Sequence, residues 1–198
     1  MITALDAIER LREGNRRFAA EESSIDRSVS HEKRAELVDG QNPFAIILAC
    51  SDSRVPVEMI FDQGLGDLFV IRVAGNVVAP SQVGSVEFAA AQLGAKLVVV
   101  LGHSNCGAVD ATLNELSQKQ ELRSPNLRAI VDRIRPAIDS LTDQDIDLQD
   151  AVIANVHHSV GRLQHGSLIL EKLVESGELV IVGAEYSIES GKVNFLNE

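Results

Sequence analysis

The fold is decided by the stretch FAIILACSDSRVP, residues 44–56, in which an apolar run stops abruptly at a cysteine. The run Phe44–Ala49 shows no alternation of apolar and polar residues, so it predicts a strand buried on both faces of a sheet. Three other runs, rich in valine or isoleucine, share this character: Leu68–Val73, Leu97–Leu101 and Leu179–Val182. Together the runs indicate parallel strands, because helices cover both faces of a parallel sheet.

Longer stretches with helical spacing of apolar residues separate these runs. They cover about Val55–Asp62, Gln82–Leu93, Ala108–Ser117, Pro125–Leu141, Leu148–Leu163 and Ser167–Ser176. This order predicts an α/β fold with an open, mainly parallel four-stranded sheet and helices on both faces. The segment KVNFL, residues 192–196, is a candidate antiparallel fifth strand at one edge.

The N-terminal part of the chain reads as helical. Residues 3–20 carry an amphipathic pattern, and a short second helix opens at Ser30 and is stopped by Gly40 and Pro43. We interpret residues 1–42 as an N-terminal helical arm of the same domain, and residues 43–198 as the α/β part that carries the chemistry.

Composition and charge exclude several classes of partner. The chain has 198 residues, 45% of them hydrophobic and 24% charged, which is typical of one ordinary globular domain. Its net charge of −11 disfavours nucleic acid and anionic membrane surfaces. The N-terminus lacks the pattern of a signal peptide, so we expect a cytoplasmic protein without a disulfide between its two cysteines.

The two cysteines and one histidine fall where such a sheet binds ligands. Cys50 and His103 follow predicted strands, and Cys106 lies three residues beyond His103. Ligands of open α/β sheets sit beyond the carboxyl ends of the strands. Two thiolates and one imidazole suit tetrahedral zinc with a fourth position left open. Two alternatives stay open on the residues alone: buried cysteines that serve as small apolar side chains, and His103 as the base that activates a Cys106 nucleophile.

Asp52 and Arg54 lie two and four residues after Cys50. Beside a zinc ion, Asp52 is a candidate fourth ligand, general base or hydrogen-bond acceptor for bound water, and Arg54 could hold it through a bidentate pair. The competing interpretation is a helix-capping aspartate followed by a surface arginine.

Read together, several segments resemble the β-class carbonic anhydrases. They are CSDSRVP, FDQGLGDLFVIRVAGNVV, GSVEFA, VVVLGHSNCGAV and GAEYSIESGKVNFL, and the resemblance runs from about EGNRRF to the C-terminus. It implies Zn²⁺ held by Cys50, His103 and Cys106 in a catalytic domain over residues 43–198. It also implies a catalytic dyad of Asp52 and Arg54.

The activity that this resemblance implies is carbonate dehydratase activity, a zinc lyase reaction. Zinc-bound hydroxide would convert carbon dioxide reversibly to bicarbonate and a proton. The alternative within the same fold is hydrolysis of carbon disulfide or carbonyl sulfide, since those hydrolases are similar and keep the same zinc ligands.

The resemblance also implies how the site is completed. Members that let the aspartate close onto zinc use a bicarbonate pocket containing tryptophan, and this chain has no tryptophan, so we expect the open, plant-like arrangement. Substrate-binding residues carry over to Gln41, Phe69, Phe88 and Gly107, and Phe88 stands where the family often has tyrosine. We expect a homo-oligomer, a dimer or a tetramer of dimers. In it Gln41, Phe69 and Phe88 face the partner's zinc and the N-terminal helix wraps the neighbour.

Overall fold

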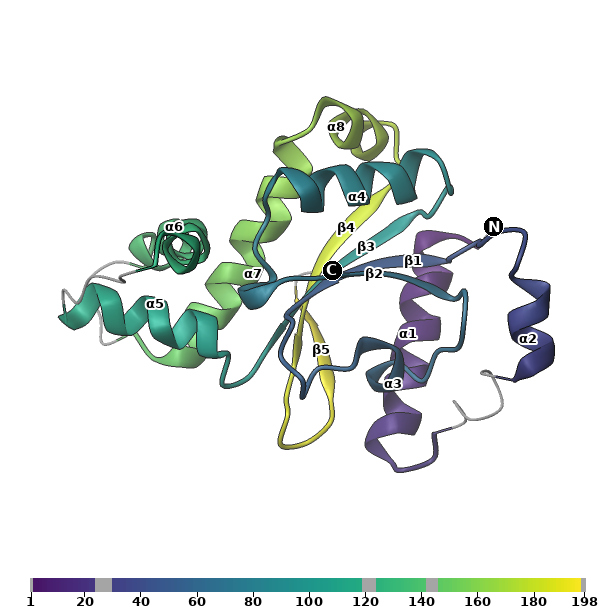
Figure 1. The fold of residues 1–198 in the computed structure, drawn as a ribbon, viewed down its shortest axis with the longest axis horizontal. Helices are drawn as coiled ribbons and strands as arrows, with labels where there is room; N and C mark the ends of the chain where they lie inside the picture. Colours follow the sequence, from purple (N-terminus) through teal and green to yellow (C-terminus); the bar gives the residue numbers. More distant parts are fainter. Residues whose placement is uncertain (1, 24–29, 119–123, 142–145, 197–198) are drawn as a thin grey trace.

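A five-stranded sheet with helices on both faces forms the centre of the structure, a computed structural model that describes residues 2–23, 30–118, 124–141 and 146–196 (Figure 1). The strands lie in the order β2-β1-β3-β4-β5. The first four are parallel, and β5 runs antiparallel to β4. Their bounds are β1 Ala45–Ala49, β2 Leu68–Arg72, β3 Leu97–His103, β4 Val180–Tyr186 and β5 Val193–Leu196. The predicted fold class, including the antiparallel edge strand, is confirmed.

Successive residues of β1 face opposite layers of helices. Ile47 packs in a cluster with α1 and α3, whereas Ile46 packs in a cluster with α4, α7 and α8. The helices are α1 Ala4–Ala19, α2 His31–Glu36, α3 Val57–Ile60, α4 Pro80–Ala91, α5 Gly107–Gln118, α6 Pro125–Asp139, α7 Leu148–His165 and α8 Leu168–Glu175, with a 3-10 turn, η2, at Ala74–Asn76. Within the described ranges, no helix combines the length and the apolar character needed to cross a membrane.

The N-terminal helix α1 packs on the core of its own chain. It begins at a capping box between Thr3 and Asp6 and buries Ala7, Ile8 and Leu11 in the cluster that includes α3. These apolar side chains of α1 are therefore buried against their own chain, without a second copy to cover them. Any contact of α1 with a neighbour would use the outer face, where Leu5 is 76% exposed.

The strands β3 and β4 are longer than predicted. Their expected ends at Leu101 and Val182 are wrong because the glycine that follows each run continues the strand. A Cβ atom at Gly102 would lie 2.5 Å from a methyl group of Val156, and one at Gly183 would lie 2.7 Å from the other. The glycines thus let α7 approach the sheet, and His103 becomes the last residue of β3 instead of lying beyond the strand.

The order of the strands defines a switch point between β1 and β3. The chain leaves β1 toward β2 on one side and then crosses to β3 on the other side. Ligands of doubly wound sheets bind in the crevice at the carboxyl ends of two such strands. Here the carboxyl end of β1 leads into Cys50 and that of β3 is His103.

Candidate metal centre

Three side chains that are far apart in sequence meet at this switch point. The sulfur atoms of Cys50 and Cys106 and a ring nitrogen of His103 all lie within 4.8 Å of one another. All three residues are buried, with exposed fractions of 5%, 1% and 0% for Cys50, Cys106 and His103. Among the residues that the structure describes, this is the one group of three or more histidine, cysteine or acidic side chains with metal-site spacing.

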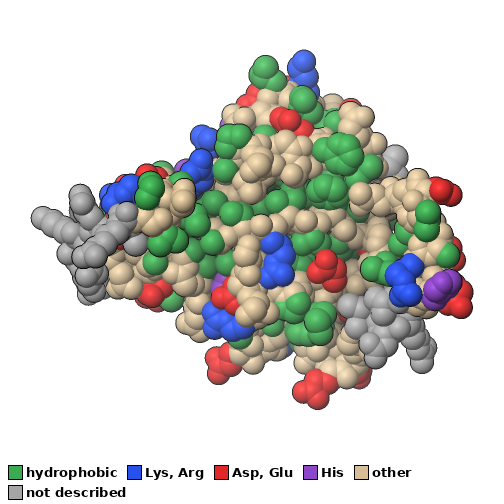
Figure 2. Space-filling model, viewed as in Figure 1, with side chains coloured by type: hydrophobic (Ala, Val, Ile, Leu, Met, Phe, Trp, Pro, Cys, Tyr) green, Lys and Arg blue, Asp and Glu red, His purple; other side chains and the backbone are tan. Residues whose placement is uncertain are grey.

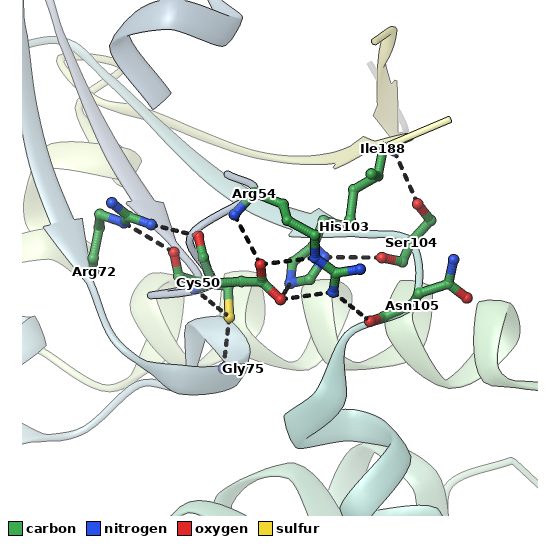
Figure 3. A network of polar contacts seen from close by, with 9 residues as sticks. Cys50, Arg54, Arg72, Gly75, His103, Ser104, Asn105 and Ile188 are labelled. Atoms are coloured by element: carbon green, nitrogen blue, oxygen red, sulfur yellow. Dashed lines mark hydrogen bonds and ion pairs between the residues drawn. The ribbon is translucent and has the colours of Figure 1, made fainter. Parts of the chain in front are cut away.

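The ring of His103 is oriented by the loop that follows β3. Its Nδ1 lies 2.9 Å from the carbonyl oxygen of Ser104, so we assign the proton to Nδ1 and a free lone pair to Nε2. Ser104 is itself held by the end of β4, since its N–H donates to Tyr186 O and its hydroxyl accepts from the N–H of Ile188. Figure 3 shows the contact between the ring and Ser104 as a dashed line.

The buried Nε2 of His103 has no hydrogen-bond partner in the described part of the chain. A buried polar atom without a partner is rare and calls for an explanation. A neutral imidazole nitrogen beside two sulfur atoms is the donor set that zinc favours, and a metal ion at this position would give Nε2 its partner. The residues therefore fit zinc, with a fourth position available.

The two thiols differ in acidity because they are hydrogen-bonded to each other. This contact lowers the pKa of Cys50 and raises the pKa of Cys106, where burial adds to the rise. Binding of a metal as two thiolates requires both sulfur atoms to be deprotonated, so metal affinity rises with pH.

Asp52 and Arg54 form a bidentate pair beside these ligands. The Arg54 Nε donates to Asp52 Oδ1 at 3.0 Å and its Nη2 donates to Oδ2 at 2.8 Å. The same Nη2 donates to the carbonyl of Asn105 at 3.1 Å, which ties the loop after β1 to the loop after β3. The guanidinium holds the pKa of Asp52 well below its usual range, so the side chain stays a carboxylate. Asp52 Oδ2 lies 4.0 Å from the free Nε2 of His103.

The helix-cap interpretation of Asp52 is not what the structure shows. The Asp52 Oδ1 accepts the N–H of Arg54 within a local turn at 2.9 Å, but α3 starts later, after Pro56. The carboxylate is thus shared between its own turn and the guanidinium of Arg54.

Sequence reasoning missed Arg72, the last residue of β2. Its Nε donates to the carbonyl of Cys50 at 3.0 Å and its Nη2 to the carbonyl of Asp52 at 2.6 Å, as Figure 3 shows for Cys50. The signal was present, because an arginine interrupts an otherwise apolar run one residue before its end. Its guanidinium holds the backbone of the loop from which Cys50 and Asp52 project.

The four candidate substrate-binding residues do not gather at the metal centre of this single chain. Phe69 on β2 and Phe88 on α4 form a tilted aromatic pair with ring centroids 6.2 Å apart, and Phe88 is 49% exposed. Gln41 lies in an exposed loop and borders a cleft with Leu65. Gly107 is the exception, because it begins α5 directly after Cys106.

The chain is similar to carbonic anhydrases over most of its length. A family model described as carbonic anhydrase matches residues 45–193. A carbonic anhydrase of Mycolicibacterium smegmatis is 40% identical over 184 residues, which cover 92% of this chain and 88% of the relative. Carbonic anhydrase 2 of Mycobacterium tuberculosis is 40% identical over 188 residues, covering 92% and 87% of the two chains. The solved β-carbonic anhydrase CafA of Aspergillus fumigatus has a TM-score of 0.72 and 30% identity, covering 84% of this chain and 81% of that chain.

Proposed function

The chain belongs to the carbonic anhydrase family and hydrates carbon dioxide, and we propose that it does so with zinc held by Cys50, His103 and Cys106. The observation that carries this proposal is the buried, unpartnered Nε2 of His103, whose ring places a nitrogen within 4.8 Å of both sulfur atoms. When bound there, zinc supplies a water molecule whose pKa falls to about 7, and so a nucleophile at near-neutral pH.

Asp52 is the residue that orients this nucleophile. Its carboxylate stays ionised and lies 4.0 Å from the proposed nitrogen ligand, so it can accept a hydrogen bond from the attacking oxygen and direct a lone pair at the carbon atom of the substrate. The new carbon–oxygen bond yields bicarbonate, and one proton leaves to solvent. Arg54 holds Asp52 through two hydrogen bonds, which keeps the carboxylate off the metal.

We propose the open arrangement of the site on two grounds. The Asp52 carboxylate is engaged by Arg54, and closure onto the metal would break both bonds of that pair. The chain also has no tryptophan for the bicarbonate pocket that helps similar enzymes to close. In this arrangement the fourth position on zinc stays available for water at neutral pH.

The proposed substrate pocket is completed by a second copy of the chain. Phe69 lies on β2, and Phe88 lies on α4, which packs beside β2. In the described residues β2 is an edge strand with no strand neighbour beyond it. Hydrophobic side chains gather over α4 and β2 on this face (Figure 2). A homodimer formed through this face would let the two aromatic rings wall the partner's pocket with Gln41, while Gly107 serves the pocket of its own chain.

Changing Phe88 to glutamate should dissociate this homo-oligomer, because a carboxylate at the centre of an apolar interface loses its hydration without gaining a partner. We expect the mass from light scattering to fall by about half or more. The matched control is Leu127→Glu, since Leu127 on α6 is 53% exposed but lies on another helix. An unchanged mass for Phe88→Glu would remove this face from consideration as the interface.

Stopped-flow hydration of carbon dioxide with a pH indicator tests the proposed function. Protein with one measured zinc per chain should hydrate carbon dioxide faster as the pH rises, because deprotonation creates the nucleophile. Protein depleted of zinc by a chelator should lose the activity and regain it with added zinc. A zinc-replete sample that is inactive above about pH 8 would refute the proposal.

Hydrolysis of carbon disulfide or carbonyl sulfide is not favoured, because the relatives similar to this chain are named carbonic anhydrases. We also propose a cytoplasmic location. Its support is that Cys50 and Cys106 are free thiols, which a reducing compartment preserves.

A further inference from the structure

The sulfur atom of Cys50 accepts hydrogen bonds from two backbone N–H groups. One belongs to Asp52 in its own loop and the other to Gly75, each at 3.4 Å (Figure 3). Donors to a thiolate stabilise its negative charge, and hydrogen bonds to the ligands of a metal tune the metal itself. The Gly75 donor comes from the turn η2 and so depends on how that turn is held.

The turn η2 has a backbone conformation that needs support. Gly75 has φ +67° and ψ +21°, and Asn76 follows with φ +43°. Two successive residues in the left-handed region are uncommon, and an asparagine there persists only where its surroundings hold it. A Cβ atom on Gly75 would lie 2.8 Å from Ile134 and 3.1 Å from Ala108, and the positive φ would strain a side chain there, so this position favours glycine.

Two side chains of α7 supply that support. Asn155 donates through Nδ2 to the carbonyl of Gly75 at 2.8 Å, and Ser159 donates to the carbonyl of Asn76 at 3.1 Å. The two side chains lie one helical turn apart and are almost fully buried, with 1% and 2% exposed. Together they fix the orientation of two successive peptide groups of the turn.

Packing alone does not account for an asparagine at position 155. Its Oδ1 is buried and has no hydrogen-bond partner in the described part of the chain, so the Gly75 carbonyl is the polar group that its side chain contacts there. An aliphatic side chain of similar size would avoid the cost of that unpartnered oxygen. The amide is therefore explained by what it does to Gly75.

We propose that Asn155 is a positioning residue of the metal centre. It holds the peptide group between Gly75 and Asn76 and so limits rotation of the Gly75 backbone, which keeps the N–H of Gly75, in the preceding peptide group, aimed at the sulfur atom of Cys50. This donor moderates the bond between that sulfur and the metal. The inference rests on the proposed metal site, but it concerns a residue that touches neither metal nor substrate.

The test compares Asn155→Leu with the matched control Asn15→Leu. Asn15 is also a buried asparagine bonded to backbone groups, those of Ile60, Gly191 and Val193, but it lies on α1 and ties that helix to the end of α3 and the start of β5. We expect Asn155→Leu to weaken zinc binding by about 10- to 100-fold in competition with a chelator. The sulfur-to-metal charge-transfer band of the cobalt-substituted protein should shift as well. Asn15→Leu should lower stability to urea and change neither quantity.

A folded Asn155→Leu protein with wild-type zinc affinity and an unchanged cobalt band would overturn the inference. If Asn155→Leu does not fold, Ser159→Ala decides, because it frees the next carbonyl of the same turn and should shift both quantities in the same direction by less. No shift in Ser159→Ala would then overturn it. The wild-type protein is assayed in parallel for zinc content and hydration, so failure of the proposed function is recognised separately.

Discussion

Replacing His103 with glutamine should strip zinc from the protein and lower carbon dioxide hydration by at least about 100-fold. His103 is the nitrogen ligand of the proposed centre and is fully buried, and a glutamine amide offers zinc a much poorer donor. Zinc affinities of roughly 10–16 kcal/mol spread over three or four ligands assign about 2.5–5 kcal/mol to each ligand, a factor of roughly 100 to 5,000. Zinc per chain after dialysis and stopped-flow hydration measure the two effects.

The control for this variant is His157→Gln, because His157 is an exposed histidine on α7 away from the ligand group. It should keep wild-type zinc content and activity. Circular dichroism separates loss of metal from loss of the fold. If His103→Gln retained one zinc per chain and normal hydration, the ligand assignment would be wrong.

Replacing Asp52 with alanine should leave zinc bound but lower the hydration rate by about 100-fold, the lower range for loss of a positioned acid or base. The zinc is retained because Asp52 pairs with Arg54 and is not one of the three proposed ligands. The rate falls because the nucleophile loses its hydrogen-bond acceptor. Asp110→Ala is the matched control, since it removes an exposed carboxylate from the first turn of α5.

The pH dependence of this variant provides a second measurement. Arg54 lowers the pKa of Asp52 in the folded protein, so the stabilisation from the pair is present above the ordinary carboxyl pKa of about 4. It is lost only as the pH falls below that value. Over about pH 6–9 Asp52 does not titrate, so wild type and Asp52→Ala should both become faster as the pH rises. Equal rates for the two proteins would make the pair purely structural.

The sequence predicted β1 and β2 correctly as parallel strands, because both runs lack polar alternation. The predicted burial on both faces holds for β1, whereas β2 is only partly buried because it lies at the edge of the sheet. The prediction failed at the ends of β3 and β4, because Gly102 and Gly183 read as breaks. From sequence alone, a glycine can mark the end of a strand or a close contact with another element. Here it marks the close contact of the sheet with Val156 of α7.

The candidate ligands could be predicted for a related reason. Cys50 and His103 lie where buried strands run out, and parallel strands bring their carboxyl ends to one edge of a sheet. From the residues alone a metal site and buried thiols stayed in competition, and the resemblance together with the unpartnered Nε2 of His103 favours the metal. Arg72 and Asn155 were missed, because each donates to a backbone carbonyl that only the folded chain brings near, although an arginine within an apolar run was a signal for Arg72.

The sequence by itself determined which side chains are available for chemistry: two thiols, one imidazole, and an aspartate two residues from its arginine. Their local order, together with the apolar runs before them, was enough to predict a fold and a family. Only the tertiary structure decided how these groups are held, with Arg54 bridging Asp52 and Asn105, Arg72 on the loop after β1, and Asn155 on the turn behind Cys50. The physical reason is that hydrogen bonds between distant segments depend on distances of a few tenths of an ångström, which arise when packing sets the helices against the sheet.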